Sequence, residues 1–193
     1  NNIEIPISNK PVISPLSPGS RTYYKYDYMG FIPNKDSVKI HKIKITPRFK
    51  NEPLLKGILF IKEDTYFIES LELELIGPIQ SDFRIKNFHI IQNYQQNENQ
   101  QLLKRKIIDY TIKEDIFKIM GNSVSIYNDF KFNQEIPNYF KKNQIKNFQD
   151  SSFLKTNNQW NNYRPIDLKE NETEYVSYTD SLREYYQSEE YAL

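Results

Sequence analysis

The chain of 193 residues carries 26 Lys and Arg against 25 Asp and Glu, so its net charge is nearly balanced at +1. This balance disfavours nucleic acid as the partner, because binding to phosphates needs a clustered excess of positive charge. The sequence contains no Cys, two His and five Gly. These counts exclude thiol catalysis, disulfides and a His-rich metal site, and they disfavour a glycine-rich phosphate-binding loop.

The first part of the chain, residues 1–21, is rich in Pro and Ser. Its four prolines withhold backbone donors and disfavour regular helix or strand. We expect an extended segment that lies over the surface of another part of the protein. Because the chain begins with Asn1 and not with Met, we expect it to be a piece of a longer protein.

Residues 22–133 contain short stretches of alternating polar and apolar positions separated by turn residues, which predicts an antiparallel β domain. The clearest stretch is 67–76, where leucines alternate with glutamates, so that one face is buried and the other meets water. At His41 the alternation of the stretch 38–45 shifts by one residue, which predicts a β-bulge there. Further strands are expected at residues 23–28, 57–61, 83–94, 102–112, 116–119 and 124–132, with a turn at Gly121 and Asn122.

Residues 134–168 lose this periodicity, and we expect a linker that wraps a sheet edge or crosses to another domain. Residues 169–193 are predicted to form one amphipathic helix, capped by Asp167, that leads to a further domain. Tyr178, Tyr185 and Tyr186 of this helix could dock on another domain, and the helix carries one apolar stripe. The residues of this stripe recur at intervals of three or four, and they are Tyr175, Tyr178, Leu182 and Tyr185.

Together these stretches predict a mainly β fold of the α+β class. Roughly six to eight strands form a curved antiparallel meander sheet, which is followed by a long linker and one C-terminal amphipathic helix. A parallel α/β fold is disfavoured, because no helices alternate with the strands.

Paired carboxylates are the first candidates for acid–base catalysis. Glu72 and Glu74 share one face of a predicted strand, about 7 Å apart by strand geometry, which is within the range of glycosidase carboxylates. The alternating pattern is, however, that of an ordinary solvated strand face. His41 and His89 lie within strand patterns, where edge or bulge positions account for them without a metal. We therefore expect no catalytic residues, no metal site and no cofactor.

The sequence is rich in aromatic residues, with 15 Tyr and 12 Phe. On a curved sheet these side chains could cover an apolar ligand or form a partner face, although they could equally form an ordinary core. The candidates for this ligand or partner face are Tyr24, Tyr26, Phe60, Phe67 and Phe88. A basic run, Lys104-Arg105-Lys106, could touch an anionic surface or simply protect a strand end from edge-to-edge pairing.

Several short motifs follow one another along the chain, and their order and spacing are informative. They are Ile13-Ser14-Pro15-Leu16, Tyr23-Tyr24-Lys25-Tyr26, Met29-Gly30, Ile43-Lys44-Ile45-Thr46-Pro47-Arg48, Pro53-Leu54-Leu55-Lys56-Gly57, Leu59-Phe60-Ile61, Trp160, Arg164-Pro165-Ile166-Asp167-Leu168 and Asp180-Ser181-Leu182-Arg183. In this order they resemble a large Bacteroidota family of unknown function, usually called carboxypeptidase-like regulatory domain-containing proteins. The resemblance covers nearly the whole chain, and residues 92–101 and 141–156 depart from its pattern.

Proteins of this family place such a middle region between an N-terminal regulatory-like β-sandwich and a C-terminal outer-membrane β-barrel. The resemblance implies a location at the periplasmic face of the outer membrane, no peptidase activity, and a segment that is not itself transmembrane. It implies as partners the protein's own or a partner outer-membrane barrel, and other cell-envelope proteins. The sheet is expected to be similar to the half-barrels of periplasmic lipoprotein carriers. Two Asp-Ser-aliphatic sites, at Ser37 and Ser181, resemble the O-glycosylation pattern of this phylum.

Three functions are open at this point. The first is a non-catalytic structural or interaction module of an outer-membrane-associated protein. The alternative is a carrier that holds a lipid or another apolar ligand in a concave β-sheet. The third is a hydrolase that uses acidic residues such as Glu72 and Glu74, and it is the least favoured because no catalytic motif accompanies the pair.

Overall fold

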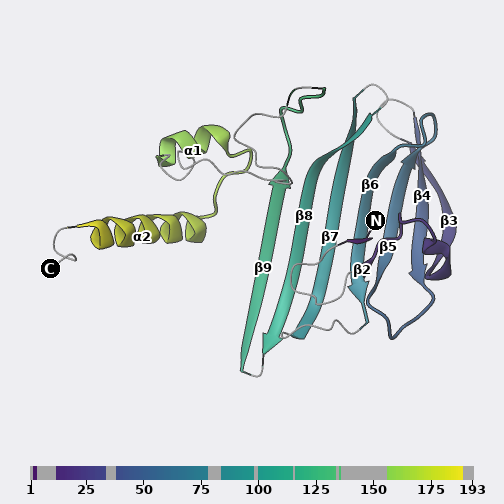
Figure 1. The fold of residues 1–193 in the computed structure, drawn as a ribbon, viewed down its shortest axis with the longest axis horizontal. Helices are drawn as coiled ribbons and strands as arrows, with labels where there is room; N and C mark the ends of the chain where they lie inside the picture. The colour runs from purple at the N-terminus through teal and green to yellow at the C-terminus, as the bar shows by residue number, and fades with distance from the viewer. Residues whose placement is uncertain are drawn as a thin grey trace. The chain divides into compact units, whose positions relative to one another are not determined.

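The computed structural model describes residues 2–3, 12–33, 38–77, 84–97, 100–114, 116–133, 135 and 156–188. The chain divides into two units, Asn1–Phe130 and Lys131–Leu193. The first unit contains the strands, and the second contains two helices (Figure 1).

The first unit is built on a seven-stranded antiparallel sheet in which each strand pairs with the next one along the chain (Figure 1). Its strands are β3 (Tyr24–Pro33), β4 (Lys39–Pro47), β5 (Leu54–Lys62), β6 (Ile68–Ile76), β7 (Arg84–Asn97), β8 (Gln100–Glu114) and β9 (Phe117–Ile126). The sheet does not close, so β3 and β9 form its two edges. The predicted antiparallel meander and the mainly β class are confirmed.

Alternation along the strands gives the sheet one buried and one solvated face. In β6, Leu71, Leu73 and Leu75 are buried, whereas Glu72 and Glu74 between them are exposed, as predicted. We call the leucine side the core face and the glutamate side the outer face. Because paired residues of neighbouring strands point to the same side, the register extends both faces into β5 and β7.

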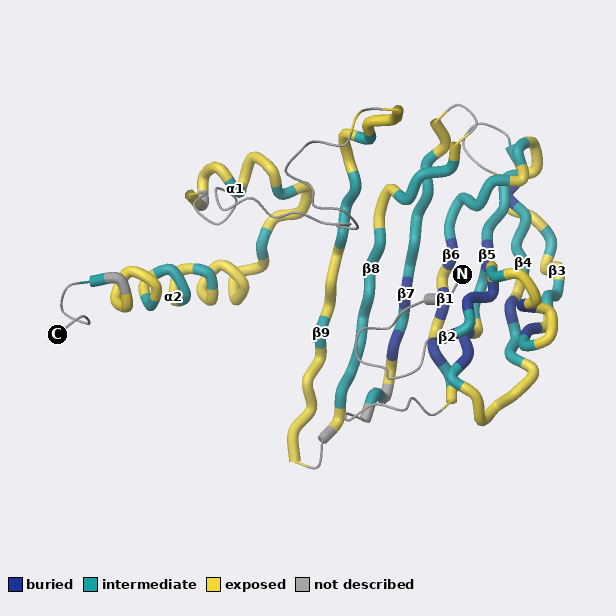
Figure 2. The backbone as a smooth tube through the Cα atoms, in the orientation of Figure 1, coloured by how far each residue is buried: buried dark blue, intermediate teal, exposed yellow. Residues whose placement is uncertain are grey.

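Part of the N-terminal segment covers the core face. β1 (Asn2–Ile3) and β2 (Val12–Ile13) pair as a separate two-stranded ribbon, and a 3-10 turn, η1 (Ser20–Thr22), leads into β3. Val12 is fully buried and belongs to the same apolar cluster as the leucines of β5 and β6. Figure 2 shows buried positions along β4, β5 and β6, in contrast to the exposed positions along β9.

Two tyrosine hydroxyls of β3 hold this segment in place. The Tyr24 hydroxyl donates to the carbonyl oxygen of Ile13 at 2.5 Å and accepts a hydrogen bond from the N–H of Leu55 at 3.2 Å. The Tyr26 hydroxyl donates to the carbonyl oxygen of Pro15 at 2.7 Å. Burial raises the pKa of Tyr24 to about 12, so its hydroxyl keeps the proton that it donates at neutral pH.

The predicted β-bulge at His41 is wrong. β4 pairs with β5 without a shift, and the irregularity lies instead in β3, where Met29 and Gly30 together oppose a single residue of β4. Ile40 and Ile45 are both buried, although their odd spacing along a regular strand puts them on opposite faces. The shift in the alternation therefore reflects burial on both faces of β4.

The predicted turn at Gly121 and Asn122 is also wrong, because β9 runs through both residues without a break. The strand predicted at residues 116–119 and the beginning of the one predicted at 124–132 are therefore one strand, which ends at Ile126. Gly121 lies opposite Tyr110 of β8, and a Cβ atom at Gly121 would lie 2.1 Å from the tyrosine ring. The glycine thus makes room for a cross-strand neighbour and does not form a turn.

The second unit contains α1 (Asn157–Tyr163) and α2 (Glu170–Gln187). The C-terminal helix is confirmed as α2, whereas the predicted cap at Asp167 is wrong. The helix begins after Lys169, whose N–H donates to the Glu172 carboxylate at 2.8 Å. The sequence pattern did not predict α1, which lies within the expected linker. No helix in the described part of the chain is long and apolar enough to cross a membrane.

The apolar stripe predicted for α2 is largely exposed. Tyr175, Tyr178 and Tyr185 each have more than half of their surface accessible, and Leu182 is half-buried. The helix therefore presents aromatic side chains to solvent, a composition that is enriched where proteins meet their partners.

Candidate functional site

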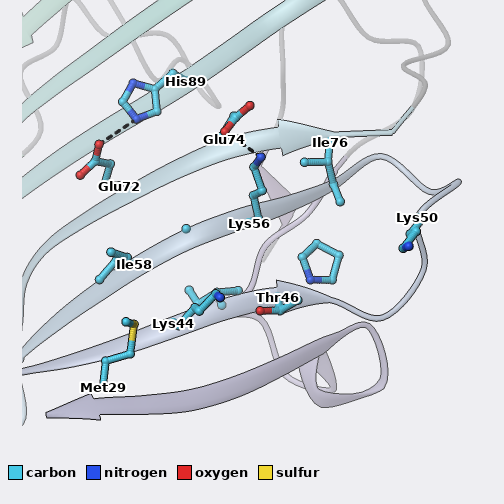
Figure 3. Close-up of a pocket in the computed structure, with 13 residues that line it drawn as sticks. Met29, Lys44, Thr46, Lys50, Lys56, Ile58, Glu72, Glu74, Ile76 and His89 are labelled. Atoms are coloured by element: carbon cyan, nitrogen blue, oxygen red, sulfur yellow. Dashed lines mark ion pairs between the residues drawn. The ribbon is translucent and has the colours of Figure 1, made fainter.

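The outer face of the sheet contains a hollow of about 590 Å³ over β4, β5 and β6 (Figure 3). This volume is within the range of sites that hold small molecules. The bulge of β3, the loop between β4 and β5, and β7 complete its rim. The lining residues are Met29, Lys44, Ile45, Thr46, Pro47, Lys50, Lys56, Gly57, Ile58, Glu72, Glu74, Ile76 and His89.

The strand register places the outward side chains of this hollow in two rows. One row runs from Lys44 through Ile58 to Glu72, because these residues are paired across β4, β5 and β6. The next row contains Lys56, Glu74 and His89 on β5, β6 and β7. Neighbouring strands lie about 4.8 Å apart, so the side chains of one row are cross-strand neighbours.

The floor of the hollow depends on a close approach of two backbones. At Gly57, a Cβ atom would lie 1.9 Å from the carbonyl oxygen of Glu72. No heavy-atom side chain fits there without moving β5 away from β6, so the position requires glycine. The sequence alone shows a glycine inside a strand, and only the register reveals which backbone it approaches.

One ion pair lies within the second row, and another joins it to the first row. Lys56 Nζ lies 3.0 Å from Glu74 Oε2, and His89 Nε2 lies 3.3 Å from Glu72 Oε1. On its other side, His89 Nδ1 lies 4.0 Å from Asp109 Oδ2. Both glutamate side chains are about half exposed, so each pair contributes little to stability, about 0–1 kcal/mol.

The same geometry bears on the hydrolase hypothesis. A glycosidase of the two-carboxylate type needs one carboxyl group that stays protonated, and it obtains this by burying that group among apolar side chains. Glu72 and Glu74 instead share a solvated face, and each contacts a basic neighbour. The arrangement therefore gives no acid and base with different environments.

Lys44 and Lys50 differ from Lys56, the third lysine of the hollow, in their ion pairing. In the part of the chain that the structure describes, neither Lys44 nor Lys50 takes part in an ion pair, whereas Lys56 does. Both are exposed, Lys44 on β4 and Lys50 on the loop that follows it (Figure 3). On the side of β4 the hollow therefore carries two lysines without an ion-pair partner among the described residues, although Asp27 of β3, which is paired with Lys25, lies opposite Lys44 in the register.

The predicted aromatic face is not a single surface. Tyr24 and Phe88 are buried in the core, and Tyr26 is half-buried on the core face beneath the N-terminal segment. Phe60 is half-buried on the opposite, outer face, and Phe67 lies in the turn before β6. The structure thus brings Tyr24 and Tyr26 together, but it separates them from Phe60.

The two histidines also lie on opposite faces. His41 Nδ1 is 3.0 Å from the Tyr28 hydroxyl, and its Nε2 is 3.8 Å from Glu63 Oε1. His89 belongs to the hollow. Among the residues that the structure describes, no group of three or more His, Asp and Glu side chains could hold a metal ion.

The remaining candidates lie away from the hollow. Ser37 lies outside the described residues. Ser181 is exposed on α2, and its hydroxyl donates to the carbonyl oxygen of Ser177 at 3.0 Å. In the basic run, Lys104 and Arg105 are exposed on β8.

The sequence analysis did not identify the lysines of the hollow. Lys44 occupies an outward position of a strand that the alternation predicts, whereas Lys56 precedes the strand expected at residues 57–61. The missing information was the register, which decides that these two positions face Glu72 and Glu74. Lys50 lies in a loop, where alternation says nothing.

Comparison with known proteins gives one match. The family of unknown function DUF5686 matches residues 1–130. The chain belongs to this family. No curated protein and no solved structure matches the chain. The matched residues coincide with the first unit, so the match covers the sheet and its N-terminal segment.

Proposed function

We propose that the chain is a non-catalytic structural and interaction module of an outer-membrane-associated protein, acting at the periplasmic face of that membrane. Membership of a family of unknown function supports no particular reaction. The order of the motifs supports the finer assignment to the Bacteroidota proteins called carboxypeptidase-like regulatory domain-containing proteins. The partner on this proposal is the protein's own outer-membrane barrel, a partner barrel or another cell-envelope protein.

The observation that carries the proposal is the exposed edge of β9. No strand in the described part of the chain pairs with its free side. Large apolar side chains are exposed on both of its faces, Phe117 and Ile119 on one and Met120 and Val124 on the other. A free strand edge of this kind accepts an added strand, since its unpaired N–H and C=O groups supply hydrogen bonds.

The other edge of the sheet is less suited to such pairing. β3 also exposes apolar side chains, but Met29 and Gly30 interrupt its register, and it ends at Pro33, which has no backbone donor. β9 pairs with β8 without a shift from Arg105↔Ile126 to Glu114↔Phe117. A regular edge offers an evenly spaced ladder, so we assign the docking edge to β9.

The test is site-specific photocross-linking in the full-length protein in its native membrane. A photoreactive amino acid replaces Met120, which is 72% exposed, and in the control it replaces Tyr66, which is 77% exposed in the turn between β5 and β6. Similar exposure means that random collisions affect both positions equally. We expect an adduct with an outer-membrane barrel, the protein's own or a partner's, from position 120 alone.

Two results would contradict the proposal. One is recovery of the full-length protein in the cytosolic fraction. The other is an equal yield of the same adducts from positions 120 and 66, because the edge strand would then have no special role.

A specific observation favours a second candidate function, which is a carrier of an apolar ligand. The hollow on the outer face is large enough for a small molecule and has an apolar floor. This site differs from the aromatic face expected from the sequence, since of those five residues none lines the hollow.

A further inference from the structure

The floor of the hollow is apolar although it lies on the solvated face of the sheet. Ile58, Ile76 and Pro47 are each half-buried there, and Met29 lies at the rim with about half of its surface exposed. The outward positions of β6 beside this floor carry Glu72 and Glu74, which belong to the same hollow. Apolar side chains grouped in a hollow are a feature of binding sites, whereas isolated ones are common anywhere on a surface.

The charged groups of the hollow are divided between its two sides. Lys44 and Lys50 lie on β4 and the loop after it, while Glu72 and Glu74 lie on β6 (Figure 3). The carboxylates have basic neighbours in Lys56 and His89, but the two lysines on the β4 side have no ion-pair partner among the described residues. An anion near β4 would therefore meet attraction, and a cation would meet repulsion.

The lining also restricts the rest of the ligand. Among the described lining residues, the only ring systems are the His89 imidazole and the Pro47 pyrrolidine. A nucleobase or sugar would gain little, because such groups usually stack on Phe, Tyr or Trp. An aliphatic chain can instead lie over Ile58 and Ile76, where each buried methylene contributes about 0.8 kcal/mol.

We propose that this hollow binds a fatty acid, with its carboxylate between Lys44 and Lys50 and its chain over Ile58 and Ile76. The inference rests on the second candidate function, the carrier, and is independent of the docking role of β9. Lys56 remains paired with Glu74, and Thr46 on β4 offers a hydroxyl near the carboxylate end.

The test compares ligands that share one chain and differ in the headgroup. Binding of decanoate, decyl phosphate, decanol and decyltrimethylammonium to the complete chain is measured by calorimetry below their micelle-forming concentrations. We expect decanoate to bind about fivefold more tightly than decanol, and the cation to bind more weakly still, since a partly exposed charge contact of about 1 kcal/mol corresponds to about that factor. Inorganic phosphate serves as the headgroup without a chain.

Matched variants locate the site. Lys44→Gln with Lys50→Gln should reduce decanoate binding to the level of decanol, whereas Lys104→Gln with Lys118→Gln, two exposed lysines outside the hollow, should leave it unchanged. Ile58→Asn should weaken decanoate and decanol alike. Circular dichroism of each variant verifies that the sheet is folded.

Several outcomes would overturn the inference. Two of them concern specificity: equal affinity for all four headgroups, or a preference for decanoate that survives the Lys44 and Lys50 substitutions. Another is full competition by inorganic phosphate alone. The last is no decanoate binding up to about 1 mM, which corresponds to a binding free energy near −4 kcal/mol. Tighter binding of decyl phosphate than of decanoate would assign the site to a phosphate lipid and also overturn it. None of these results affects the cross-linking at Met120, so failure of the hollow and failure of the docking edge are distinguishable.

Discussion

β6 and β9 are both rich in large apolar residues, but they use them differently. In β6, Leu71 and Leu73 lie on one face and are buried beneath the N-terminal segment. In β9, Ile119 and Met120 lie on opposite faces, and both are exposed. The apolar residues of β6 therefore stabilise the sheet. Those of β9 contribute little to the stability of the isolated unit, and they suit burial against a partner.

The strongest test of this contrast is truncation of one side chain in each strand. Leu73→Ala should lower the free energy of unfolding by about 2–5 kcal/mol, because it leaves a cavity in the core. Met120→Ala should change it by less than about 0.5 kcal/mol, since the side chain is already in water. Urea unfolding of the purified chain measures both. Equal losses would show that β9 belongs to the core and would remove the contrast.

Substitution of two glycines tests the same difference between the centre of the sheet and β9, at the level of the backbone. Gly57→Ala should destabilise the chain by about 1–3 kcal/mol, because the new methyl group collides with the Glu72 carbonyl in the centre of the sheet. Gly121→Ala in β9 should cost less, since its nearest atoms belong to the Tyr110 side chain, which can move. The same urea experiment applies. A larger loss at Gly121 would mean that the edge strand is held more rigidly than the central strands.

The next largest change in the free energy of unfolding is expected from the hydrogen bonds that attach the N-terminal segment. Tyr24→Phe removes the hydroxyl that bridges Ile13 and Leu55, and it should cost about 1–2 kcal/mol because two backbone groups lose a partner. Tyr28→Phe is the matched control, since Tyr28 is exposed on the edge strand β3 and its hydroxyl contacts a side chain, His41, and no backbone group. Comparable effects of the two substitutions would argue against a tyrosine attachment of the segment.

This attachment also predicts a dependence on pH. Burial raises the pKa of Tyr24 from 10.0 to about 12, so between these values the unfolded chain loses the proton more readily than the folded chain. The free energy of unfolding should therefore fall as the pH rises from about 10 to about 12, and the contribution is complete below about pH 10. Tyr24→Phe should show a shallower fall in urea midpoints over this range. An identical slope in both proteins would contradict the assignment.

The smallest effect concerns the ion pair in the hollow. A double-mutant cycle of Lys56→Ala and Glu74→Ala should give a coupling energy of about 0.5 kcal/mol or less, because both side chains are about half exposed and screened by water. A coupling above about 2 kcal/mol would show that the outer face supports the fold, in conflict with its assignment as a binding surface.

The sequence predicted the strands well where one face is buried. In β6 the alternation of Leu71 and Leu73 with glutamates follows directly from a sheet with one wet face, and the structure confirms it. The prediction failed where this condition is not met. Ile40 and Ile45 are buried on opposite faces of β4, so the alternation shifts between them and predicts a β-bulge. Gly121 is small because Tyr110 lies across from it, but in the sequence this glycine predicts a turn.

The candidate site was harder to predict, because it depends on which strands lie side by side and in which register. Periodicity shows that Lys44 and Glu72 point outward, but it does not show that Ile58 lies between them. The helix α1 was missed for a related reason. Its start is a local signal, Thr156 and Gln159 in a capping box, but only one short run of helix follows it.

Amide hydrogen exchange is the most direct test of whether β9 is a docking edge. The measurement compares the isolated chain with the full-length protein in its native membrane. We predict that the amides of β9 exchange much more slowly in the full-length protein, while those of β6 are protected equally in both, because an added strand would hydrogen-bond only to the free edge. Unchanged exchange in β9 between the two preparations would contradict the claim.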